Sequence, residues 1–94
     1  MTKQVVKAPS SVLDVGIVWT KWLNSGDKII SSTWTTSDVS VATSDSTHDN
    51  NSTRVLVAGG ELGKSYSVTN RITTEDGLVD ERYILLFIQN QGAI

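Results

Sequence analysis

The chain has 94 residues, no cysteine and a formal net charge of −2. This length predicts a single domain over residues 1–94, and the lack of cysteine excludes disulfides and thiolate metal sites. The charges form no basic stripe, which argues against a nucleic-acid partner. No signal-peptide run and no segment near ~18 apolar residues is present, so we expect no membrane partner and synthesis in the cytosol.

The first part of the sequence predicts short strands separated by turns, with mobile ends at 1–3 and 90–94. Gln4–Lys7 reads as an extended segment that ends at Pro9, a residue suited to a sheet edge or a change of strand. Val12–Trp19 predicts a second strand. Residues 20–24 predict one helical turn, because Thr20 can cap its start and Gly26 can adopt a positive φ at its end.

The middle of the chain predicts two further strands and a long connection. Asp27–Thr35 alternates, and its inward face is expected to hold Ile30 and Trp34 because the large aromatic lies on that side. Val39–Ala42 predicts a shorter strand. Thr43–Thr53 is polar throughout, and we expect an exposed, mobile connection there.

The next strand is expected at Arg54–Ala58, with Val55 and Val57 facing inward, before a glycine-rich turn at Gly59–Gly63. No helix of three turns is indicated anywhere along the chain. About seven short strands with such turns predict an all-β, immunoglobulin-like sandwich of two sheets.

A β-hairpin after this turn carries most of the expected core. Tyr66, Val68 and Ile72 recur at the period-two spacing of a strand with one buried face. The dipeptide Asp76-Gly77, placed before a second apolar run, is a hairpin signal.

The spacing of this hairpin leaves two registers open. A two-residue turn at Asp76-Gly77 pairs Val68 with Leu85, whereas a three-residue loop at Glu75–Gly77 pairs Val68 with Ile84. The last strand is apolar on both faces, with two alternating stripes: Tyr83, Leu85 and Phe87; and Ile84, Leu86 and Ile88. One stripe must therefore be covered by a protein partner or by a terminal segment of the chain itself.

Few residues suggest catalytic or metal chemistry. The single histidine, His48, lies in a polar segment where nothing would hold it as a general base. Asp45, Asp49 and the two following asparagines lack the spacing of a calcium-binding loop. We therefore expect neither an enzyme nor a bound metal or cofactor.

One polar cluster interrupts the hairpin, where Asp80–Arg82 lies opposite Asn70 and Arg71. It is either a structural network, in which Asn70 or Arg82 satisfies backbone carbonyls, or a site that pairs with a subunit carboxylate. Arg71 or Lys64 is also placed to stack on an aromatic ring.

The three tryptophans divide between core and surface. Trp34 is expected in the core, and Trp19 is expected to close its end. Trp22 stays open, since it is placed either to pack inward beside Trp19 or to form an exposed anchor for a protein or a sugar.

The sequence resembles small tailed-bacteriophage proteins described as fibre-tail adaptors. The resemblance spans about residues 7–89 and is carried by Val12–Asp14, Trp19–Leu23, Gly26–Trp34, Gly59-Gly60, Tyr66–Thr74, Gly77 and Asp80–Arg82. It implies that Ile84, Leu86 and Ile88 face the core, as they do in the hairpin register with the three-residue loop. Residues 39–53 depart from the family pattern, and Tyr83, Leu85 and Phe87 stand where polar side chains are expected, which makes them a candidate contact stripe.

The resemblance implies a structural protein of the virion, made in the host cytoplasm and present in several copies. A symmetric homo-oligomeric ring would contact portal, tail or fibre proteins, with Tyr83, Leu85, Phe87, Arg71 and Trp22 as candidate interface residues. Two alternatives are a capsid decoration protein and a carbohydrate-binding immunoglobulin-like module.

Overall fold

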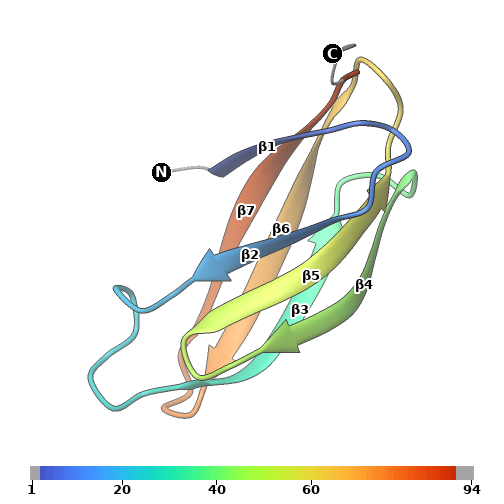
Figure 1. The fold of residues 1–94 in the computed structure, drawn as a ribbon. Coiled ribbons are helices and arrows are strands. Elements are labelled where there is room, and N and C mark those ends of the chain that lie inside the picture. Colours follow the sequence, from blue (N-terminus) through green and yellow to red (C-terminus); the bar gives the residue numbers. More distant parts are fainter. Residues whose placement is uncertain (1–2, 91–94) are drawn as a thin grey trace.

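The computed structural model describes residues 3–90, which form seven β-strands in two facing sheets (Figure 1). Of the ends expected to be mobile, residues 1–2 and 91–94 lie outside the described residues, and Lys3 begins the first strand. The strands are β1 (Lys3–Lys7), β2 (Leu13–Val18), β3 (Ile29–Thr36), β4 (Val41–His48), β5 (Ser52–Gly59), β6 (Ser65–Thr74) and β7 (Val79–Ile88).

The strand order is that of an immunoglobulin-like sandwich. One sheet has the order β1-β7-β6-β3 and the other has the order β2-β5-β4. The orders β3-β6-β7 and β2-β5-β4 correspond to the C-F-G and B-E-D arrangements of an immunoglobulin constant domain. The first strand, β1, pairs in parallel with β7. The expected all-β sandwich is therefore confirmed.

Residues 3–90 contain no helix, and thus no helix long and apolar enough to cross a membrane. The helical turn expected at residues 20–24 is a single hydrogen-bonded turn. In it, the backbone N–H groups of Trp22 and Leu23 donate to the carbonyl of Trp19 at 2.9 and 3.1 Å. Gly26 follows with the expected positive φ of 83°.

The buried side chains form two clusters. The main cluster lies between the sheets and contains Val15, Val41, Val55, Val57, Tyr66, Val68, Ile84, Leu86 and Ile88, with Trp34 packed partly against it. The second cluster closes one end of the sandwich and contains Trp19, Ile29 and Ile72, with Trp22 and Leu23 packed partly against it. Ile17 contacts both clusters and so makes the core continuous.

The prediction that Ile30 faces the core is wrong. Ile30 is 53% exposed, whereas its neighbour Ile29 is only 3% exposed. A β-bulge explains the exchange, because Ile29 pairs with Thr74 and Ser31 pairs with Thr73, which leaves one extra residue on β3. The extra residue reverses the alternation of side chains between the two halves of the strand.

The predicted boundaries around β4 are also wrong. Residues 43–53 were expected to be a loop, but β4 runs from Val41 to His48 and a short turn leads to β5 at Ser52. Val39, expected in a strand, precedes β4 and is fully exposed. Because β4 is an edge strand with most of its side chains in solvent, polar Ser and Thr residues suffice to build it.

The last hairpin adopts the register with the three-residue loop. Val68 pairs with Ile84, and Gly77 has a φ of 87° at the end of the loop. The loop closes when the N–H of Gly77 donates to the carbonyl of Thr74 at 2.9 Å. Gly77 fits this left-handed position because it has no Cβ.

Tyr66 fixes the turn that leads into β6. The backbone N–H of Glu61 donates to its phenolic oxygen at 3.0 Å, an arrangement like the tyrosine corner of immunoglobulin domains. A Cβ at Gly60 would lie 2.6 Å from the Cδ1 atom of Ile88, so only glycine fits there without a shift. The turn and the core are thus packed together.

Lys7 ends β1 with its side chain buried. It pairs with Ile88, which faces the core, and its ammonium donates to the carbonyls of Ala8 and Gly59 at 2.7 Å and of Pro9 at 3.2 Å. Burial lowers the pKa of this ammonium below its ordinary value of 10.5. The hydrogen bond to Gly59 ties β1 to the end of β5 in the opposite sheet, and the other two hold the chain that follows β1.

The two faces of β7 predict different costs of truncation. Leu86→Ala should lower the free energy of unfolding by about 2–5 kcal/mol, because it opens a cavity in the main cluster. Leu85→Ala, one residue away on the outer face and already half-buried, should cost clearly less. Urea denaturation of both variants measures the difference, and equal losses would contradict the division of faces.

Candidate functional site

An apolar stripe lies on the outer face of the four-stranded sheet. On β7 it contains Tyr83, Leu85 and Phe87, since the alternate residues of that strand face the core. On β1, Val6 pairs with Phe87 and extends the stripe. Tyr83 is 49% exposed and Val6 is 46% exposed, while Leu85 and Phe87 are half-buried. We call these four residues the outer stripe.

The strands beside β7 border the outer stripe without covering it. β1 lies next to β7 in the same sheet, as the ribbon shows (Figure 1), so it adds Val6 to the stripe instead of shielding it. On the other side, the paired residues of β6 are Ser65, Ser67 and Thr69. These short hydroxyl side chains rise less above the sheet than the apolar side chains between them and β1.

Arg71 lies on the same outer face and already has a partner within the chain. Its guanidinium forms an ion pair with Glu81 at 2.8 Å, and both side chains are more than half exposed. Lys64 likewise pairs with Glu61 at 2.8 Å. The predicted stacking of Arg71 or Lys64 on an aromatic ring is therefore replaced by surface ion pairs, each worth up to about 1 kcal/mol.

Trp22 packs against Trp19 and does not join the outer stripe. The two rings meet edge to face, with centroids 5.4 Å apart, in the second cluster. Trp19 is completely buried, so the pair does not form an exposed stacking platform for a sugar. Trp22 itself is partly buried, in the turn that follows β2.

Asn70 is the centre of a buried hydrogen-bond network that joins the two sheets. Its side-chain oxygen accepts hydrogen bonds from Trp19 Nε1 at 3.1 Å and from the hydroxyl of Thr53 on β5 at 2.7 Å. Its side-chain nitrogen donates to the hydroxyl of Ser32 at 2.9 Å and to the carbonyl of Thr33 at 3.0 Å. The amide thus uses its full hydrogen-bonding capacity. Of the two accounts of the polar cluster, this geometry matches the structural network.

Arg82, which pairs with Asn70 across the hairpin, covers the same network from outside. Its guanidinium carbon lies 4.4 Å from the centre of the Trp19 ring, the distance of a cation–π contact. The sequence pattern predicts Arg82 in this cluster, through its pairing with Asn70, but gives no indication of the ring that it contacts.

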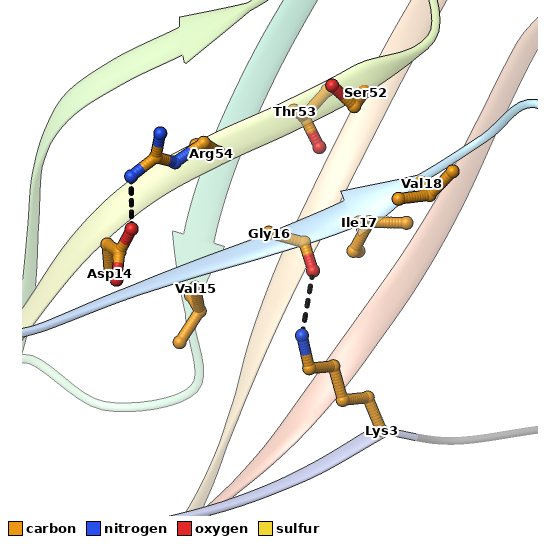
Figure 2. Close-up of a pocket in the computed structure, with 9 residues that line it drawn as sticks. All are labelled: Lys3, Asp14, Val15, Gly16, Ile17, Val18, Ser52, Thr53 and Arg54. Carbon is orange, nitrogen blue, oxygen red and sulfur yellow. Dashed lines mark hydrogen bonds and ion pairs between the residues drawn. The ribbon is translucent and has the colours of Figure 1, made fainter.

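A second surface feature runs along β2, where a cavity of about 350 Å³ opens beside the strand (Figure 2). Asp14 and Arg54 form an ion pair on one side of this cavity. On the other side, the ammonium of Lys3 donates to the carbonyl of Gly16 at 3.2 Å. The cavity is shallow and is lined by both charged and aliphatic side chains, and no sequence pattern indicates it.

His48 lies at the end of β4 next to a cavity of about 210 Å³. Its Nδ1 is 3.1 Å from the backbone carbonyl oxygen of Asp49, and its side chain is exposed. Within residues 3–90, no group of three histidine or acidic side chains is gathered closely enough to hold a metal ion.

The Asp49 carboxylate is used in the turn between β4 and β5. It accepts hydrogen bonds from the backbone N–H of Asn51 at 3.0 Å and from the N–H and hydroxyl of Ser52, both at 2.8 Å. The hydrogen bond from Asn51 is the largest of the effects that hold the pKa of Asp49 below its ordinary value of 3.8. The side chain thus caps the turn.

Comparison with known protein families gives a match over most of the chain. The sequence model of the family described as podophage GP4 fiber-tail adaptor protein gp77 matches residues 7–87. This range runs from the last residue of β1 to the penultimate residue of β7. No curated protein matches the chain.

Removing the Asn70 amide should destabilise the sandwich strongly. Asn70→Ala leaves the indole N–H of Trp19 and the hydroxyl of Thr53 without their acceptor, and we expect a loss of about 3 kcal/mol in unfolding free energy. Thr69→Ala, on the outer face of the same strand, is the matched control and should change stability little. Denaturant titration followed by tryptophan fluorescence would contradict the role of Asn70 if both variants behaved alike.

The Asp49 turn predicts a pH dependence. Because the folded-state pKa is lowered, the carboxylate stabilises the fold above about pH 4 and loses this effect as the pH falls through the lowered pKa. Asp49→Ala should therefore lower the melting temperature at about pH 7 and approach the parent protein near pH 2. Calorimetry at both pH values measures the gap, and a gap that stays constant with pH would contradict this role.

Proposed function

The chain belongs to the podophage GP4 fiber-tail adaptor family, and on this premise we propose that it is a non-enzymatic structural protein of the virion, linking fibre and tail. The match over residues 7–87 supports this role. The protein is made in the host cytoplasm and becomes part of the particle during assembly. Its task is to present surfaces at fixed positions.

The outer stripe is the observation that carries the proposed contact. Val6, Tyr83, Leu85 and Phe87 form a continuous apolar face on two paired strands, bordered by hydroxyl side chains. Aromatic and aliphatic side chains at the centre of a patch with a polar border are typical of protein interfaces. Burial of this face against a neighbouring subunit would remove it from water.

Several copies would act together in a symmetric ring, in contact with portal, tail or fibre proteins. A repeated contact adds many modest interactions, so each copy can bind weakly while the assembly is stable. The small size of the domain fits this arrangement, because one face of a β-sandwich offers limited contact area.

Substitutions in the outer stripe test the proposal. Purified protein should form a ring or co-elute with its virus's portal or tail proteins in size exclusion with light scattering. Tyr83→Ala and Phe87→Ala should each weaken this association about fivefold or more, because large aromatic side chains contribute most to interface energy.

Val39→Ala is the matched control, since Val39 is fully exposed in the turn before β4 and should have no effect. A lasting monomer in every mixture, with both folded variants indistinguishable from the parent, would contradict the adaptor role. Labelling of intact particles separates an adaptor from a capsid decoration protein, because an adaptor lies at one vertex and a decoration protein covers the shell.

A further inference from the structure

The outer edge of β2 is a free strand edge. β2 pairs with β5 on one side, and within residues 3–90 no strand pairs with its other side. In an immunoglobulin constant domain, strand A pairs with this edge. Here the first strand, β1, pairs with β7 in the opposite sheet and leaves the edge of β2 open.

Two hydrogen bonds show which backbone groups point outward. The N–H of Trp19, just after β2, donates to the carbonyl of Asn51 on the β5 side at 2.8 Å. The carbonyl of Gly16 instead accepts its hydrogen bond from the side chain of Lys3. Because backbone groups alternate along an antiparallel strand, Asp14, Gly16 and Val18 direct their N–H and C=O groups toward the open edge.

A groove of about 200 Å³ lies between this edge and β7. Its apolar walls include Ile17 and Val18 of β2 and the ring of Tyr83 on β7. Val18 is 69% exposed, which is unusual for a valine within a strand and gives a strand added there an apolar side chain to pack on.

Two cations without a carboxylate partner line the same groove. Among the described residues, Arg54 and Arg71 each form an ion pair with an acidic side chain, whereas Arg82 stacks on Trp19 and pairs with no carboxylate. The ammonium of Lys3 donates to the carbonyl of Gly16 and has no acidic partner within residues 3–90 either. The groove is therefore locally cationic in a chain whose net charge is −2.

We propose that the free edge of β2 binds an extended, acidic segment of another protein, which adds a strand to the β2-β5-β4 sheet. Backbone hydrogen bonds to Val18 and to the N–H of Gly16, whose carbonyl already accepts from Lys3, would hold the segment, and one of its carboxylates would lie between Lys3 and Arg82. That the segment belongs to a neighbouring tail protein rests on the proposed function. The free edge, the apolar wall and the two cations are observations that do not depend on the proposed function.

A peptide titration tests this site without any virion protein. The probe is an end-blocked peptide of alternating threonine and valine with one central glutamate, compared with the same peptide carrying glutamine. In NMR spectra of the ¹⁵N-labelled protein, the amide signals of Asp14, Gly16 and Val18 should shift. The glutamate peptide should bind about two- to fivefold more tightly, an advantage that disappears at high salt.

Charge variants locate the carboxylate. Lys3→Gln and Arg82→Gln should each reduce the preference for glutamate, and Lys3→Gln serves as the second variant because it leaves the Trp19 contact of Arg82 intact. Arg71→Gln removes a cation from the outer face of the same hairpin and should leave the preference unchanged.

Three results would overturn the proposal: no shifts, shifts confined to β1 or β4, or equal affinity for the two peptides. The outcome is independent of the tail-binding test. Intact peptide binding together with failed assembly would count against the proposed function, and the reverse result would count against the β2 site.

Discussion

The side-chain amide of Asn70 makes four hydrogen bonds in the interior of the sandwich, and it reaches every layer of the fold. Thr53 belongs to one sheet, Ser32 and Thr33 to the other, and Trp19 to the turn between them. A buried amide has a high cost unless all its groups are paired, so the network tolerates only one relative placement of the two sheets. In a chain without cysteine, this polar link joins the two sheets, as a disulfide between strands B and F does in antibody domains.

The position of β1 creates both candidate surfaces. By pairing with β7, the strand places Val6 beside Phe87 and widens the outer stripe. By the same pairing, it leaves one side of β2 without a paired strand in the described part of the chain. One surface is a sheet face and the other is a sheet edge, and they meet at Tyr83, which belongs to the outer stripe and also lines the groove beside β2.

The sequence was most informative where structure is local. The alternation of Tyr66, Val68 and Ile72 and the left-handed Gly77 are properties of neighbouring residues, so the last hairpin was predictable. Its register was not settled by spacing, since both faces of β7 are apolar. The family resemblance favours the register with the three-residue loop, and the pairing of Val68 with Ile84 agrees with it.

The two wrong predictions, at Ile30 and around β4, and the burial of Lys7, which no sequence pattern indicates, have a common physical origin: each depends on contacts that no local pattern encodes. The bulge near Ile30 reverses the alternation of β3, and nothing in the period of that strand marks where it occurs. The polar strand β4 is stabilised by its partner β5, not by apolar residues of its own. Lys7 is buried because three backbone carbonyls surround its ammonium, and lysine is ordinarily read as a surface residue.

The parallel pairing of β1 with β7 also sets the order of events during synthesis. β1 leaves the ribosome before the other strands. Because Lys3 and Lys7 pair with Ile84 and Ile88, it can pair only after nearly the whole domain has been synthesised. Such long-range pairing is slow compared with the closure of the β6–β7 hairpin, whose strands are adjacent in sequence. Before that moment the edge of β7 that β1 later occupies is bare, and nascent copies are then most prone to pair with one another.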